Sequence, residues 1–143
     1  MKVDSIDNKI IIYLRDINSS DLEELCRDVI NKLNDYYNIE LKGFYDVIIY
    51  IDSKYGSVLE FILEDLDLYY DYSKVDLHII KKDVNFLYQV DDILDLNIDK
   101  FYLYHNKYYI PLDNLTLRNI EFGRIIYQNT NQIIRNGSLM CKE

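Results

Sequence analysis

The stretch FYDVIIYID, from Phe44 to Asp52, decides the fold because its side chains alternate between two faces. The positions with odd numbers are apolar, whereas Asp46 and Asp52 fall on the other face, and this period of two predicts a β-strand. The link Ser53-Lys54-Tyr55-Gly56 supplies the glycine that a tight turn needs for a positive φ. Residues 59–64 alternate in the same way, so the two runs predict a β-hairpin.

An amphipathic helix is predicted upstream of this hairpin. The segment Ser20-Asp21-Leu22-Glu23 matches a capping box, in which the Ser20 hydroxyl and the Glu23 carboxylate each accept a hydrogen bond from the other's backbone N–H. The helix is expected to end near Tyr36 or Tyr37 and to pack its apolar stripe on a sheet. The residues that form this stripe are Leu22, Leu25, Cys26, Val29, Ile30 and Leu33.

The other predicted strands are short. His105-Asn106-Lys107 is a compact link between the last two of them, which predicts a second hairpin. Pro111 has no N–H to donate, so its strand is expected to lie at a sheet edge or to stop there. The predicted strands outside the first hairpin cover residues 9–14, 75–80, 85–90, 101–104 and 108–112.

The segment after Asp113 leaves alternatives open. Its first apolar group allows a short helix, and Ile133 and Ile134, before Asn136-Gly137, allow a strand or the end of a helix. The first apolar group consists of Ile120, Phe122, Ile125 and Ile126.

The order of the elements predicts an α+β fold. An N-terminal strand and an amphipathic helix would pack on a mostly antiparallel, meandering sheet, with a short C-terminal helix as an option. The chain has 143 residues and no linker rich in Pro, Gly or Ser, so a single domain over residues 1–143 is expected.

Composition and charge limit the possible partners. The chain has no alanine and no tryptophan, and its common residues have codons rich in A and T. An AT-rich genome therefore explains much of its count of fifteen tyrosines. A formal net charge of −9 would be repelled by nucleic acid and by anionic membranes. Direct nucleic-acid binding is not expected, and the negative charge is more compatible with a basic protein as the partner.

The cysteines and the hydropathy predict a cytoplasmic protein. Cys26 and Cys141 have no C-x-x-C spacing, and two free thiols suit a reducing compartment. Cys26 lies on the helical stripe and is expected to be a small buried side chain. The longest apolar run, residues 10–14, is too short to span a bilayer, and the first seven residues do not resemble a signal peptide.

Motifs for catalysis, cofactors or metals are not found in the sequence. His78 falls in a strand and His105 in a turn, where each is expected to be a structural polar residue. The glycines match no phosphate-binding loop, and neither acidic group, residues 64–71 nor residues 91–95, has the spacing of an EF-hand. No cofactor, metal site or catalytic residue is predicted, although an unfamiliar enzyme stays open.

The most distinctive segment alternates acidic residues with tyrosines. Tyrosine offers a large contact area at low entropic cost, and flanking carboxylates suit a partner that carries Arg or Lys. The alternative is that the leucines and tyrosines of this segment cover the core while its acidic residues face water. The residues predicted to bind a partner are Glu64, Asp65, Asp67, Tyr69, Tyr70, Asp71 and Tyr72.

These features favour a small acidic protein-interaction or regulatory module without catalytic activity. A homodimer formed by sheet extension is a variant of this interpretation. The first rival is a small enzyme or ligand-binding domain with a pocket built from dispersed Tyr, Asp and His residues. The second rival is a DNA-mimic inhibitor of a nucleic-acid-binding protein, which would show one continuous acidic face.

Overall fold

The computed structural model describes residues 1–15, 21–64, 75–91, 100–114 and 123–141. The chain divides into two compact units, Met1–Asp83 and Val84–Glu143, and each unit contains its own sheet. Within the described residues there are ten strands and two α-helices. The predicted α+β class is confirmed, with two mostly antiparallel sheets in place of one. That residues 1–143 fold as one domain stays a prediction.

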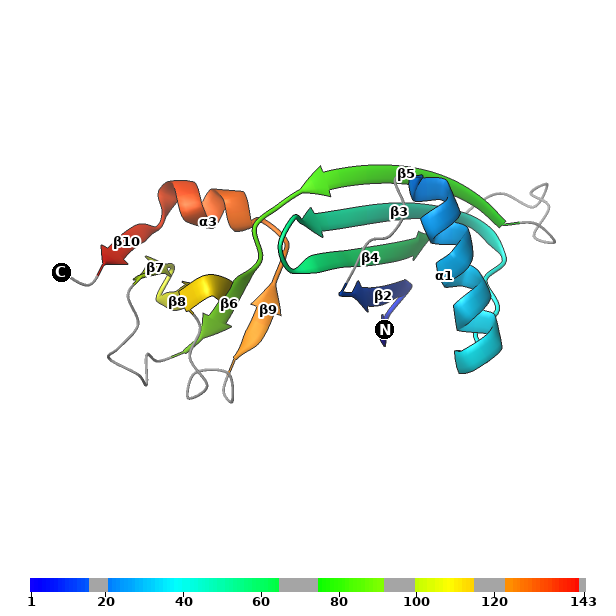
Figure 1. Cartoon of the computed structure of the whole chain (residues 1–143), viewed down its shortest axis with the longest axis horizontal. Helices are drawn as coiled ribbons and strands as arrows, with labels where there is room; N and C mark the ends of the chain where they lie inside the picture. Colours follow the sequence, from blue (N-terminus) through cyan, green and yellow to red (C-terminus); the bar gives the residue numbers. More distant parts are fainter. Residues whose placement is uncertain (16–20, 65–74, 92–99, 115–122, 142–143) are drawn as a thin grey trace. The chain divides into compact units, whose positions relative to one another are not determined.

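The first unit is a five-stranded sheet with one long helix (Figure 1). Its strand order is β1-β2-β4-β3-β5, and all neighbours are antiparallel except β3 and β5. Its elements are β1 (Lys2–Ile6), β2 (Lys9–Leu14), α1 (Leu22–Tyr37), β3 (Gly43–Asp52), β4 (Gly56–Leu63) and β5 (Val75–Asp83).

The β3–β4 hairpin matches the prediction from its alternating sequence. Its loop is held by Asp52, whose Oδ1 accepts hydrogen bonds from the backbone N–H groups of Lys54 (2.9 Å) and Tyr55 (3.3 Å). Gly56 follows with a φ of +107°. A Cβ there would lie 2.2 Å from the carbonyl oxygen of Leu14, so glycine is needed for both the turn and the close approach of β2.

The helix α1 begins one residue later than the predicted capping box implies. Its N-cap is Asp21, whose Oδ1 accepts hydrogen bonds from the N–H groups of Glu23 (3.0 Å) and Glu24 (3.2 Å). The prediction of Ser20 as the N-cap is therefore wrong. The Asp21 carboxylate accepts both bonds and places negative charge beside the positive helix end. At the other end, Asn38 adopts a left-handed conformation with a φ of +55° and stops the helix.

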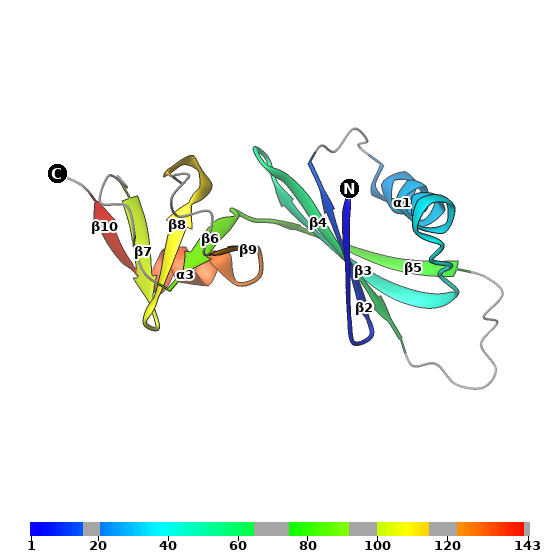
Figure 2. The ribbon, with the colours of Figure 1, turned by 90° about the horizontal axis from the view of Figure 1, so that it is seen from below.

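The core of the first unit lies between α1 and one face of the sheet. The predicted helical stripe is buried there, and Figure 2 shows α1 on one side of this sheet. Two features of the sheet were not predicted: the strand β1, and the parallel pairing of β5 with β3. The fully or nearly fully buried residues of this core include Ile12, Cys26, Val29, Leu33, Val47, Ile49, Leu59 and Phe61.

The second unit is a five-stranded antiparallel sheet with the order β10-β7-β8-β6-β9. Ile133 of its helix packs on Leu87, Tyr102 and Tyr109. Its elements are β6 (Leu87–Val90), β7 (Lys100–Tyr104), β8 (Lys107–Pro111), the 3-10 helix η1 (Leu112–Asn114), β9 (Arg124–Ile126), α3 (Thr130–Asn136) and β10 (Ser138–Cys141).

Several expectations for the second unit are corrected. Pro111 does end its strand, but β8 is the central strand and not an edge strand. The missing N–H is tolerated because Pro111 is the last residue of the strand. Ile125 and Ile126 lie in β9 instead of a helix, because they pair with β6 and their β-branched side chains suit a strand. Ile133 and Ile134 lie in the predicted short C-terminal helix.

Candidate functional site

The predicted acidic and aromatic contact segment is represented by one described residue, Glu64. Its N–H donates to the carbonyl oxygen of Phe44 at 3.0 Å, just beyond the end of β4. The other predicted contact residues lie outside the described residues, as do the acidic positions 92 and 95. The residues in question are Asp65, Asp67, Tyr69, Tyr70, Asp71 and Tyr72.

A broader surface is formed by the face of the first sheet opposite α1, which we call the outer face. Strand alternation and the pairing register place the side chains of five strands on it. Within the described part of the first unit, no helix lies over this face. Its residues are Lys2, Asp4, Ile6, Lys9, Ile11, Tyr13, Phe44, Asp46, Ile48, Tyr50, Asp52, Val58, Glu60, Ile62, Asp76, His78, Ile80 and Lys82.

One row crosses the outer face from edge to edge. The register aligns Lys2, Tyr13, Val58, Tyr50 and Lys82 on successive strands. The Lys2 ammonium lies 5.3 Å from the centre of the Tyr13 ring, and the Lys82 ammonium lies 5.7 Å from that of Tyr50. Both distances are within the range of a cation–π interaction. Each tyrosine is therefore held between its lysine and the central valine.

The centre of the outer face is buried and its rim is exposed. Glu60 is 1% exposed in the central strand β4, whereas Ile80 on the edge strand β5 is 39% exposed. Burial raises the pKa of Tyr13, and the charges of Asp4 and Glu60 add to this effect. A negatively charged tyrosinate is therefore disfavoured, and Tyr13 stays a neutral hydrogen-bonding group at physiological pH.

A histidine and a carboxylate meet at the other end of this face. The Nδ1 atom of His78 lies 3.1 Å from Oδ1 of Asp46 across the parallel β5–β3 pair. A side-chain hydrogen bond with Glu64 lowers the pKa of Asp46, and His78 adds to this effect, while burial opposes it. The neighbours of His78 on the same face of its strand are Asp76 and Ile80, and neither has a hydroxyl or thiol group that a histidine base could activate.

The predicted positions of the two histidines, one in a strand and one in a turn, are confirmed. The side chain of His78 is 63% exposed on its strand. His105 occupies the β7–β8 turn with a φ of +47°, followed by Asn106 with a φ of +62°, which is the pattern of a two-residue hairpin turn. Neither histidine lines the pocket described below.

The two cysteines are free and differ in environment. Cys26 is fully buried in the helix–sheet core, as predicted, and this burial raises the pKa of its thiol to about 12. A thiol with this pKa is almost entirely protonated at neutral pH, which makes it a poor nucleophile. Cys141 is exposed in β10.

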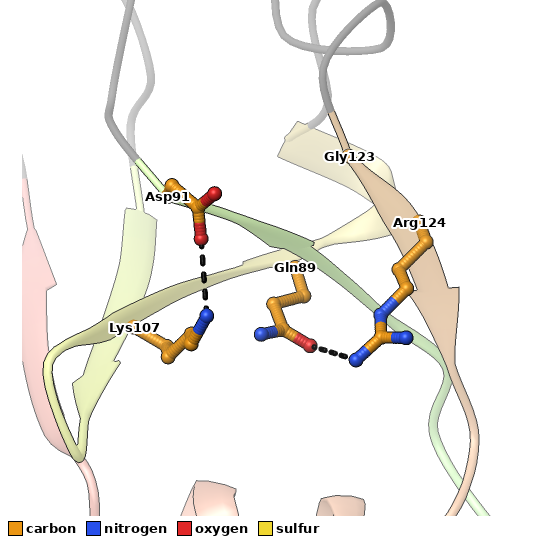
Figure 3. A pocket seen from close by; sticks show the side chains of 5 residues that line it. All are labelled: Gln89, Asp91, Lys107, Gly123 and Arg124. Atoms are coloured by element: carbon orange, nitrogen blue, oxygen red, sulfur yellow. Dashed lines mark hydrogen bonds and ion pairs between the residues drawn. The ribbon is translucent and has the colours of Figure 1, made fainter.

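An open pocket of about 300 Å³ lies on the second unit (Figure 3). It is lined by Gln89, Asp91, Lys107, Gly123 and Arg124, which come from β6, β8 and the start of β9. Lys107 Nζ lies 3.1 Å from Asp91 Oδ1, and Arg124 Nη2 lies 3.5 Å from Gln89 Oε1. No sequence pattern predicted this site, because its residues lie far apart in the chain and become neighbours only when the sheet forms.

The described residues contain no group of three or more His, Cys, Asp or Glu side chains arranged to hold a metal ion. None of their helices has the length and apolar character that a membrane span requires. Comparisons with known protein families, curated proteins and solved structures find no match to this chain.

Proposed function

We propose that this protein is a non-catalytic protein-interaction module that binds a protein partner through the outer face of its first sheet. The observation that carries the proposal is the exposed rim of this face, where Ile80 lies with Lys2 and Lys82, the two lysines that end the tyrosine row. The half-buried Tyr13 lies beside Lys2, and aromatic residues with a polar surround are typical of protein interfaces. No described helix of the first unit covers this face.

Some apolar side chains of the outer face stay accessible to a partner. Phe44, Ile48 and Ile62 are half-buried, and Ile80 is 39% exposed. A partner that covered them would remove further apolar surface from water, which is favourable by about 25 cal/mol per Å².

The charges support a basic protein as the partner. The net charge of −9 attracts a basic protein over long range and speeds encounter. The outer face itself mixes three lysines with five acidic residues, so it does not form the continuous acidic face of a DNA mimic. A cytoplasmic location belongs to the proposal, supported by the free thiols of Cys26 and Cys141.

The rival proposal of a small enzyme receives less support from the geometry. His78 does lie beside a carboxylate, but its side chain is 63% exposed on the sheet face, and neither it nor Asp46 lines the described pocket of the second unit. The described pocket of the second unit contains no histidine and no tyrosine.

The test is affinity capture from an extract of the cells that express the protein. The bait is used as wild type, as Ile80→Glu, and as Tyr36→Glu, a control on the far side of α1 with 79% exposure. We expect a basic protein that is captured by the wild type and by Tyr36→Glu, and lost with Ile80→Glu or at high salt. Equal capture by all three baits would remove the outer face as the contact surface.

A further inference from the structure

We propose that the pocket of the second unit binds a small oxyanion, which is a free carboxylate- or phosphate-bearing molecule. This function is separate from the protein contact proposed for the first unit. The pocket has its own residues, Gln89, Asp91, Lys107, Gly123 and Arg124, all within Val84–Glu143.

The charge of the lining favours an anion. Lys107 and Arg124 bring two positive charges, and Asp91 brings one negative charge. Asp91 pairs with Lys107 at 3.1 Å, so among the described residues of the lining Arg124 is the cation without an acidic partner. This local positive charge is notable in a chain with a net charge of −9, because it places a cationic spot where most of the surface is acidic.

Among the described residues, the guanidinium of Arg124 uses only part of its hydrogen-bonding capacity. Within the described residues its hydrogen-bonding partner is Gln89 Oε1, at 3.5 Å, beyond the usual N–H···O range of about 2.7–3.2 Å. A guanidinium carries five N–H donors in a planar fork that matches the two oxygens of a carboxylate or phosphate. An oxyanion would therefore form shorter bonds than Gln89 does.

The sheet fixes the positions of these groups. Gln89 and Arg124 are direct partners in the β6–β9 register, and Asp91 follows two residues later on the same face. Gly123 allows β9 to lie close to β6, because the Cβ of any other residue there would lie 2.4 Å from both the carbonyl oxygen of Gln89 and the ring of Tyr88. The backbone of Arg124, which follows Gly123, is therefore positioned by the close approach of β9 to β6.

The size of the pocket limits the ligand. A volume of about 300 Å³ is at the lower end of the range for small-molecule sites. Its polar and charged lining offers little apolar contact. A compact, highly charged molecule fits these conditions better than a large apolar one.

The experiment is an NMR titration of the full chain with sodium phosphate and, separately, with sodium citrate. Sodium chloride at matched ionic strength is the control. We expect saturable shifts of the Gln89, Asp91 and Arg124 amide signals with at least one of the two anions, and none of these with chloride. The anion that binds distinguishes phosphate from carboxylate as the preferred source.

Three variants complete the test. Arg124→Gln should weaken binding roughly tenfold or more, because it removes charge-assisted hydrogen bonds. Asp91→Asn should strengthen binding, because it removes the carboxylate that competes for Lys107. Lys32→Gln, an exposed change on α1, should leave the affinity unchanged. Equal binding by the wild type and Arg124→Gln, or no saturable shift with either anion, would overturn the proposal.

Discussion

His78 and Asp46 face each other across the parallel β5–β3 pair, with Nδ1 of the histidine 3.1 Å from Oδ1 of the aspartate. Asp46 also shares a side-chain hydrogen bond with Glu64, which is the larger cause of its lowered pKa. Residues from β3, from β5 and from the position just after β4 are thus linked at one end of the outer face. This cluster predicts that the contribution of Asp46 to the stability of the first unit depends on pH.

Asp46→Asn should reduce stability at neutral pH and have little effect in strong acid. Because the pKa of Asp46 is lowered in the folded state, its contribution is present above the unfolded pKa and is lost as pH falls through the folded pKa. The difference should be about 1 kcal/mol or less, since the group is partly exposed. Thermal unfolding from neutral pH to below about pH 3 measures it. An equal difference at every pH would contradict the assigned cause, and Asp28→Asn on α1 is the exposed control.

The two thiols should differ in their reactivity toward reagents in solution. Cys26 is fully buried with a pKa of about 12, and Cys141 is exposed. A thiol-specific chromogenic reagent should therefore label one cysteine in the native protein and two in denaturant. Cys141→Ser should abolish the native reaction. Rapid native labelling of Cys26 would contradict its place in the core.

Val29→Asp should unfold the first unit. Val29 is 2% exposed in the core between α1 and the sheet, and an unpaired buried charge costs about 3–5 kcal/mol. That loss is comparable to the whole stability of many small proteins. NMR spectra should lose the dispersed signals of Met1–Asp83, whereas Tyr36→Asp, on the exposed side of α1, should keep them. A cooperative, wild-type-like transition would contradict the helix packing.

The same variant tests the prediction of a single domain. If residues 1–143 fold as one domain, Val29→Asp should also remove the dispersed signals of Val84–Glu143. Persistence of those signals would show that the two compact units fold independently.

Gly56→Ala should destabilise the β3–β4 hairpin by roughly 2–4 kcal/mol. The position has a φ of +107°, and an added Cβ would lie 2.2 Å from the carbonyl oxygen of Leu14. Chemical denaturation measures the loss. Ser53→Ala, an exposed change in the same loop, should be nearly neutral by comparison. Similar stabilities for the two variants would argue against the tight approach of β2 to Gly56.

The elements with strong local patterns could be predicted from the sequence. The apolar stripe through Val29 and Leu33 predicted α1, and strict alternation through Val47 and Ile49 predicted β3. The strand β1, with the sequence KVDSI, was missed because only two of its residues are apolar. Its stability depends on antiparallel pairing with β2, which no local pattern reports.

The candidate surfaces could not be predicted, because they depend on strand order and register. Lys2, Tyr13, Val58, Tyr50 and Lys82 become one row only after β2 pairs with β4 and β5 pairs with β3. The sequence instead favoured the local run of acids and tyrosines that begins at Glu64. Its other residues lie outside the described residues, so its role in binding stays a prediction.

Lysine footprinting tests the outer face as a contact surface most directly. The purified protein and the protein in extract of its own cells are labelled with an amine-reactive ester, and each lysine is quantified by mass spectrometry. We predict that Lys2 and Lys82, at the two ends of the tyrosine row, are labelled less in the extract, whereas Lys32 on α1 is labelled equally in both. Equal labelling of Lys82 and Lys32 in both samples would contradict the proposed interface.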